Sequence, residues 1–332
     1  MPTQLQHLRL PIICSPLFLA SQPRLIIEQC KAGFVGSFPA LNARPASLLA
    51  DWIDEIRETL GQVAADPARR FPVAPFAVNQ IDHVSNKRLE EDMKICVDRK
   101  VPIIISSLRP TPAFIDEVHR YGGLYFHDVI SVRHARKAID AGVDGLILVC
   151  AGAGGHAGTL SPFALLSEVR EFFDGPLVLA GAMSTGSSVL AAVAAGADFA
   201  YLGTRWLATP EAEISESYRQ MIVESSAADI RYSDYFSGVS GNYLGKSIAA
   251  VGVDPDQIPK RDPDKRLDMS ENDPNTKIKP WRDVWSAGQG VGTIHAIQTV
   301  QEVADQLEGE FHAARSRLWG RVRNDQHSIA VV

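Results

Sequence analysis

The chain has 332 residues, a formal net charge of −6 and four cysteines with no Cys-x-x-Cys spacing. It offers no basic field of the kind that attracts nucleic acid or an anionic membrane, and its cysteine pattern indicates neither a disulfide framework nor a zinc site. The N-terminus lacks a signal-peptide pattern and no apolar run approaches ~20 residues. We therefore expect a soluble, cytoplasmic protein without a nucleic-acid or membrane partner.

Short apolar runs alternate with helical patterns through the first 205 residues. The runs are predicted strands, at residues 10–13, 34–37, 73–78, 102–105, 124–127, 145–150, 177–180 and 199–202. Amphipathic helices are predicted between them, at residues 22–31, 45–60, 87–99, 112–121 and 132–141. Eight strands in strict alternation favour a parallel sheet closed into a (β/α)8 or TIM barrel over an open sheet.

The pattern changes after residue 205. A helix is predicted at 211–227, an aromatic and glycine-rich stretch occupies 231–244, and residues 254–280 are rich in Pro, Asp and Lys. We interpret residues 211–280 as a small cap inserted over the barrel mouth. Residues 1–210 and 281–332, the latter with a long helical pattern at 299–322, then form the barrel.

Two neighbouring strands of the predicted barrel end in glycine-containing loops. Gly181-Ala182-Met183 follows one strand, and Gly203-Thr204 follows the next. Glycine lets backbone N–H groups approach an anion, and a following helix N-terminus adds the positive end of its dipole. The two loops therefore indicate a phosphate cradle.

The loop at 151–158 contains a single ionisable side chain, His156, among glycine and alanine residues. It follows a predicted strand, so the imidazole is expected at the barrel face where such enzymes keep their sites. An imidazole is close to neutral at pH 7 and can accept a proton, and small neighbours leave room for a substrate. The alternative is a structural histidine hydrogen-bonded within a tight loop.

Several motifs, taken together in this order, resemble those of the nitronate monooxygenase (formerly 2-nitropropane dioxygenase) family of FMN-dependent barrel enzymes. The resemblance covers nearly the whole chain. The motifs are Pro11-Ile-Ile, Pro75-Phe-Ala-Val-Asn79, Ser131-Val-Arg-His-Ala135, Gly154-Gly155-His156-Ala157-Gly158, Gly181-Ala-Met183, Gly203-Thr204-Arg205-Trp206 and Trp285-Ser-Ala-Gly-Gln-Gly290.

The resemblance implies an FMN across the C-terminal mouth of the barrel. The phosphate would bind the two glycine loops, and Asn79 would hydrogen-bond the pyrimidine edge of the flavin. The full set of cofactor-binding residues implied is Ser15, Pro16, Leu17, Asn79, Gly155, Gly181, Ala182, Met183, Gly203, Thr204, Ser286 and Gln289. His156 matches the family's base, which removes a carbon-bound proton from neutral nitroalkanes. The expected reaction is oxidation of alkyl nitronates, or of nitroalkanes, with O2, and a homodimer is left open.

Two positions depart from the family pattern. Cys14-Ser15-Pro16-Leu17 stands where many bacterial relatives have Gln-Gly-Gly-Met, and Asp128 stands where some relatives have a lysine near the cofactor. We expect Asp128 to cap the following helix, an ordinary role for aspartate. These departures keep two alternatives open: an FMN-dependent NAD(P)H reductase of a quinone or enoyl thioester, and a barrel that only binds FMN or another phosphorylated ligand.

Other candidate residues have ordinary structural interpretations. Cys14 and Cys150 lie in apolar runs and are expected to be buried small hydrophobes. His134 is expected on the surface of a helix, whereas His127 is harder to assign. Tyr235 and Phe236 fit equally well as the lining of a substrate pocket and as a small core within the cap.

Overall fold

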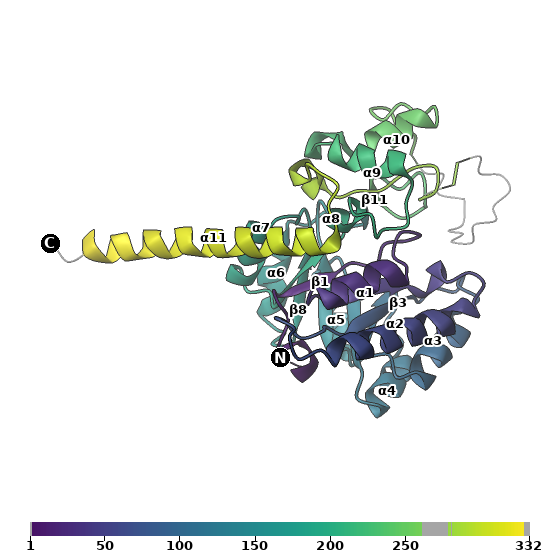
Figure 1. The fold of residues 1–332 in the computed structure, drawn as a ribbon. Coiled ribbons are helices and arrows are strands. Elements are labelled where there is room, and N and C mark those ends of the chain that lie inside the picture. Colours follow the sequence, from purple (N-terminus) through teal and green to yellow (C-terminus); the bar gives the residue numbers. More distant parts are fainter. Residues whose placement is uncertain (1, 261–277, 280, 329–332) are drawn as a thin grey trace.

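The computed structural model describes residues 2–260, 278–279 and 281–328 (Figure 1). Within them, eight parallel strands form one sheet in the order β1-β9-β8-β6-β5-β4-β3-β2. The strands are β1 Ile12–Cys14, β2 Gly36–Pro39, β3 Phe76–Ile81, β4 Ile103–Ser107, β5 Leu124–Val129, β6 Gly145–Val149, β8 Leu177–Ala180 and β9 Phe199–Leu202. Since the strands alternate with helices along the chain, the arrangement confirms the predicted (β/α)8 architecture.

The first and last strands of this order are joined just before β2. Ile13 forms a parallel bridge with Val35, and the N–H of Cys14 donates to the Val35 carbonyl at 2.8 Å. This short contact closes the sheet into a barrel, so the carboxyl ends of all eight strands face one mouth.

Helices cover the outside of the barrel and continue beyond it (Figure 1). They are α1 Pro23–Lys31, α2 Leu48–Ala64, α3 Leu89–Asp98, α4 Pro112–Arg120, α5 Val132–Asp140, α6 Pro162–Arg170, α7 Gly186–Ala194, α8 Thr204–Leu207, α9 Glu216–Val223, α10 Gly245–Ala250 and α11 Val300–Ser328. Short 3-10 helices are η1 Thr3–Leu5, η2 Ala40–Asn42, η3 Ala227–Asp229 and η4 Gln289–Thr293. None of these described helices has the length and apolarity needed to cross a membrane.

The long helix α11 packs against α7 and then extends away from the barrel (Figure 1). The two helices approach so closely that a Cβ added to Gly186 would lie 2.0 Å from the Leu307 carbonyl oxygen. Glu310 also accepts a hydrogen bond from the Gly186 N–H at 2.7 Å. The C-terminal helix is therefore fixed to the barrel by its first half.

The barrel interior is filled by alternate residues of the strands. Its apolar members include Ile13, Val35, Ala77, Ile103, Ile105, Phe126, Ile147, Val178, Ala180, Phe199 and Tyr201. Side chains alternate across a strand, so residues two positions further along point inward again, one layer closer to the mouth. This rule determines which side chains form the floor of the site.

A second, three-stranded antiparallel sheet stands over the mouth, in the order β10-β11-β7. Its strands are β10 Ile230–Ser233, β11 Gly241–Leu244 and β7 Gly155–His156. The sequence predicted neither the β10–β11 hairpin within 231–244 nor a strand in the loop at 151–158. Because β7 pairs with a strand more than 80 residues away, its formation depends on tertiary contact rather than on local pattern.

Two predicted elements have different bounds in the structure. Strand β3 begins at Phe76 rather than at residue 73, since Pro75 has no N–H to donate to a ladder. The helix predicted at 211–227 is limited to Glu216–Val223 because Ser215 caps its start and Ser226 begins a separate capping box. Residues 261–277 and 280 of the predicted cap lie outside the described residues, and the boundaries at 211 and 280 stay predictions.

Candidate active site

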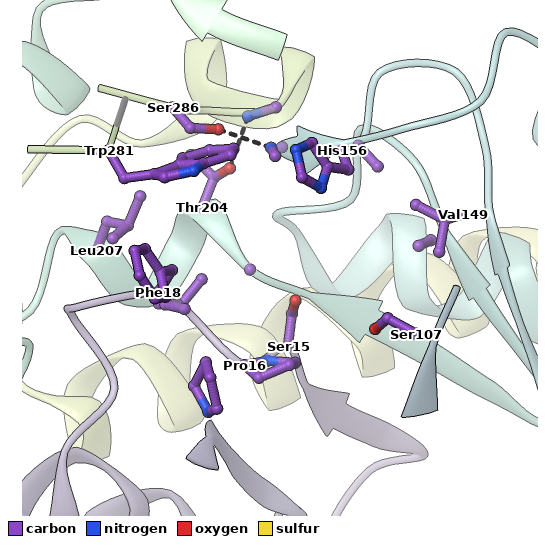
Figure 2. Close-up of a pocket in the computed structure, with 18 of the residues that line it drawn as sticks. Ser15, Pro16, Phe18, Ser107, Val149, His156, Thr204, Leu207, Trp281 and Ser286 are labelled. Carbon is purple, nitrogen blue, oxygen red and sulfur yellow. Dashed lines mark hydrogen bonds between the residues drawn. The ribbon is translucent and has the colours of Figure 1, made fainter. Parts of the chain in front are cut away.

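A pocket of about 420 Å3 opens at the carboxyl ends of the barrel strands. Its lining draws on the carboxyl ends of the eight barrel strands and the segments that follow them, on residues 235–238 between β10 and β11, and on residues between 279 and 290. Figure 2 shows His156 and Trp281 on one side of the pocket, and Ser15 and Ser107 on the other. The site thus lies between the barrel floor and the three-stranded sheet.

The floor of the pocket carries a row of hydrogen-bonded polar side chains, one from each of three neighbouring strands. We call Asn79 on β3, Ser107 on β4 and Asp128 on β5 the polar ladder. Each lies two residues after an inward apolar residue of its strand, which explains why all three face the mouth. Asn79 Nδ2 donates to Ser107 Oγ at 3.0 Å, and Ser107 Oγ donates to Asp128 Oδ2 at 2.6 Å.

Asp128 does not cap the helix that follows it, so that expectation was wrong. Its strand continues to Val129, and the N-cap of α5 is Ser131, whose hydroxyl accepts from the His134 N–H. Asp128 instead lines the pocket, where its Oδ1 is buried without a hydrogen-bond partner among the described residues. Burial raises the pKa of this carboxyl to about 7, although the Ser107 hydrogen bond acts in the opposite direction.

The glycine loops after β8 and β9 lie side by side in the pocket wall. Gly181, Ala182, Met183, Gly203 and Thr204 all line it, as the sequence led us to expect. Gly181 and Ala182 have φ values of 137° and 55°, which turns the chain sharply where β8 ends.

The same wall contains hydroxyl groups that the fold leaves available. Ser184 Oγ is buried, lines the pocket and has no partner among the described residues. Thr204 Oγ1 accepts from the Gly288 N–H at 2.8 Å and keeps its own proton to donate (Figure 2). A buried hydroxyl without a partner is costly, and an oxyanion bound at this wall would satisfy both groups.

His156 lies on β7, where Gly241 of β11 is its partner in the ladder. The ring contacts Trp281 edge to face, with centroids 5.4 Å apart, and Nε2 is 2.9 Å from Ser237 Oγ. Burial lowers the pKa of His156 to about 4, so the imidazole is neutral at pH 7. It can therefore accept a proton in the pocket.

Ser237 holds Nε2 of this histidine. Its hydroxyl donates to the Val239 carbonyl at 2.9 Å and accepts from Tyr243 Oη at 3.0 Å. When its proton is used in this way, Ser237 Oγ accepts from the His156 tautomer that is protonated on Nε2. In that tautomer the basic nitrogen of the ring is Nδ1, for which no hydrogen bond to a described residue is found.

Ser286 lies in the pocket lining and Gln289 lies outside it, and their role as cofactor contacts stays a prediction. Ser286 lines the pocket, but its hydroxyl accepts from the Gly155 N–H at 2.6 Å and donates to the Asn242 carbonyl at 2.7 Å. It anchors the strand that carries His156 (Figure 2). Gln289 is exposed and outside the lining, and its N–H donates to the Gly152 carbonyl at 2.8 Å.

The pocket is also lined by the other residues that the sequence selected as cofactor contacts: Ser15, Pro16, Leu17, Asn79 and Gly155. Cys14 and Cys150 are buried free thiols, as expected. Tyr235 and Phe236 both line the pocket, and Phe236 also packs into a core with Tyr243, Ile248 and Val284. A role of the two aromatic residues in substrate binding stays a prediction.

The two histidines beside the fifth strand lie apart from the pocket lining. His127 points to the outer side of the strand, where its Nδ1 is 2.6 Å from Ser106 Oγ. Burial lowers the pKa of His127 to about 4. His134 is exposed on α5, as predicted.

Sequence reasoning did not select several lining residues: Ser107, Ser184, Tyr201, Ser237, Trp281 and Gly288. A signal existed for Ser107, because inward alternation from Ile105 places it beside Asn79. Ser237 and Trp281 carried no such signal, since their positions depend on the fold of the segments over the mouth.

Comparison with known proteins gives one family match and several distant relatives. The nitronate monooxygenase family model matches residues 24–250. A nitronate monooxygenase of Paraburkholderia phytofirmans is 28% identical over 293 residues, covering 74% of this chain and 76% of the relative. The (3aS,4S,5R,7aS)-5-hydroxy-7a-methyl-1-oxo-octahydro-1H-indene-4-carboxyl-CoA dehydrogenase of Rhodococcus jostii is 24% identical, covering 74% of this chain and 65% of the relative.

Among solved structures, FabK from Thermotoga maritima superposes with a TM-score of 0.75. The two chains are 22% identical, and the match covers 96% of this chain and 97% of FabK. At that identity the likeness supports the barrel fold alone. The family match covers more than half of the chain and agrees with the motif order and the barrel, so the chain belongs to the nitronate monooxygenase family of oxidoreductases.

Proposed function

We propose that this protein binds FMN at the barrel mouth and oxidises alkyl nitronates, and nitroalkanes, with O2. The observation that carries the proposal is the placement of His156, a neutral imidazole facing the same pocket as the two glycine loops. Its substrate would be a small molecule. A cytoplasmic location and a homodimeric assembly stay predictions from the sequence.

The residues present fit an FMN. The phosphate would be held at the wall formed by the loops after β8 and β9, where Ser184 Oγ lacks a partner and Thr204 Oγ1 retains a proton. The pyrimidine edge would meet the polar ladder, and the Ser15–Leu17 segment would run beside the rings. When bound, the flavin supplies the electron transfer to O2, while the protein supplies position and electrostatics.

His156 would remove the carbon-bound proton of a neutral nitroalkane. Ser237 holds Nε2, and in the tautomer protonated there Nδ1 is the nitrogen with a free lone pair. Trp281 packs against the ring and excludes water from one side of it. An imidazole with a pKa of about 4 is fully in its basic form at neutral pH, although it is a weaker base than a solvated histidine.

The test is anaerobic stopped-flow absorbance of the purified yellow holoprotein. Loss of flavin absorbance on mixing with propyl-2-nitronate, and with 2-nitropropane in the wild type but not in His156→Asn, is the expected result. His134→Asn is the matched control, because it makes the same change on an exposed helix face. A holoprotein whose flavin absorbance is unchanged by nitronate contradicts the proposed oxidation.

A second candidate is an FMN-dependent NAD(P)H reductase of a quinone or enoyl thioester on the same scaffold. The observation that favours it is the Rhodococcus relative, whose name specifies a carboxyl-CoA dehydrogenase. Mixing the holoprotein anaerobically with NADH or NADPH separates the two functions. Loss of flavin absorbance with the nicotinamide alone would move the assignment to the reductase.

A further inference from the structure

The polar ladder ends in a carboxyl group whose surroundings disfavour negative charge. Asp128 Oδ2 is held by Ser107, and Oδ1 is buried with no hydrogen-bond partner among the described residues. No Lys or Arg among the described residues forms an ion pair with this carboxyl group. The lining cations, Lys279 and Arg282, belong to the segment over the mouth, and Arg282 pairs with Asp283.

The titratable group that faces Asp128 from another strand is Tyr201 on β9. Its hydroxyl is buried beside Ser15 and makes no hydrogen bond of ordinary geometry to a described residue. Burial, and secondly the Asp128 carboxylate, raise the pKa of Tyr201 well above its usual value. On its own strand the neighbouring His127 turns outward to Ser106. In the described part of the chain, Asp128 therefore has no positive partner when ionised.

The ladder has a fixed direction. Asn79 donates to Ser107 and also to the Ile105 carbonyl, and Ser107 donates to Asp128. A protonated carboxyl group adds one more donor to this chain, whereas an ionised carboxylate presents only acceptors. The pyrimidine part of a flavin offers two carbonyl oxygens and N1 as acceptors, and one N–H, at N3, as a donor. The neutral acid is the complementary form where Asp128 meets one of the three acceptors.

Resting on the FMN site proposed above, we propose that Asp128 enters the flavin complex as a neutral carboxylic acid. It donates its carboxyl proton to a carbonyl oxygen or N1 of the flavin's pyrimidine ring, so that cofactor affinity depends on a proton. The free protein loses this proton as pH rises through about 7. Each further pH unit should weaken binding by up to about tenfold, until the pKa of the complex is reached.

The experiment measures FMN affinity of the apoprotein between pH 7 and pH 9 by quenching of flavin fluorescence. Over this range a phosphate monoester, with its second pKa of about 6, stays doubly ionised. His156 stays neutral as well. Asp128→Asn keeps an acceptor for Ser107 and presents an amide donor at every pH. Exposed Asp116→Asn makes the same charge change away from the pocket.

We expect the FMN Kd of the wild type and of Asp116→Asn to rise at least about fivefold from pH 7 to pH 9. The Kd of Asp128→Asn should change by less than about twofold over the same range. A wild-type Kd that is flat or falls with pH overturns the proposal without reference to any variant. So does a folded Asp128→Asn that fails to bind FMN, since its amide supplies the donor. A folded wild type that binds no FMN at any pH overturns instead the cofactor on which the inference rests.

Discussion

The floor of the pocket, which is the polar ladder, and its roof, which is the three-stranded sheet with Ser237 and Trp281, are built in different ways. The polar ladder comes from three consecutive strands of one sheet, and alternation along each strand is enough to aim its side chains at the mouth. His156 is held by Ser237, Trp281 and the β11 strand, which come from chain segments 80 to 125 residues away. The comparison shows that strand alternation positions the floor locally, whereas His156 is positioned by long-range contacts. Variants should therefore separate cofactor binding from proton removal.

Removing the imidazole should produce the largest separation. His156→Asn is expected to lower kcat/KM for a neutral nitroalkane about 10²- to 10⁴-fold, because the general base is lost. FMN affinity should change little, since the floor is intact. Oxidation of a pre-formed nitronate, which needs no proton removal, should fall far less. Equal losses with both substrates would show that the histidine acts on something other than the carbon-bound proton.

The second prediction concerns the floor alone and is measured on the apoprotein. A carboxyl whose folded pKa is raised to about 7 destabilises the fold as pH rises from the unfolded value of about 4 to 7. The free energy of unfolding of Asp128→Asn, relative to that of wild type, should therefore be larger at pH 8 than at pH 4. The expected increase is on the order of 2 kcal/mol. Urea unfolding at the two pH values measures this. A difference between the two proteins that does not depend on pH would contradict a raised pKa.

Variants of Ser237 test whether this residue positions the His156 ring. Ser237→Ala removes the hydrogen bond to His156 Nε2, so the ring loses its fixed orientation and its preferred tautomer. Turnover of a nitroalkane should fall by about tenfold, the equivalent of one hydrogen bond. Ser237→Thr keeps a hydroxyl and should restore most of the activity. FMN affinity is the internal control and should be unchanged in both variants. An alanine variant as active as wild type would remove Ser237 from the positioning role.

The smallest expected effect is at the middle of the ladder. Ser107→Ala removes the donor to Asp128 and the acceptor of Asn79, and should weaken FMN binding by about three- to tenfold. Nitroalkane turnover at saturating flavin should remain close to wild type. A variant that loses turnover while retaining its flavin would indicate that floor and roof are coupled.

The sequence predicted the barrel well because its signals are local. Glycine loops after β8 and β9, the alternation of strand and helix, and the position of His156 at the barrel mouth all follow from short patterns. The prediction for Asp128 was wrong because aspartate before a helix is a common cap. The N-cap of the helix is instead Ser131, three residues further along the chain. The pairing of β7 with β11 was missed because a two-residue strand has no periodicity of its own.

The pairing of β7 with β11 has a consequence for how this protein could be re-engineered. Strand β7, which carries His156, is also an edge of the sheet over the mouth. The chain around it is tied to that sheet again by Asn242 donating to Ala153 and Tyr232 donating to Ala157. A chimera that replaces residues 230–244 with those of a relative would therefore also replace the strand with which β7 pairs. We expect such an exchange to alter the position of the His156 ring together with the pocket lining.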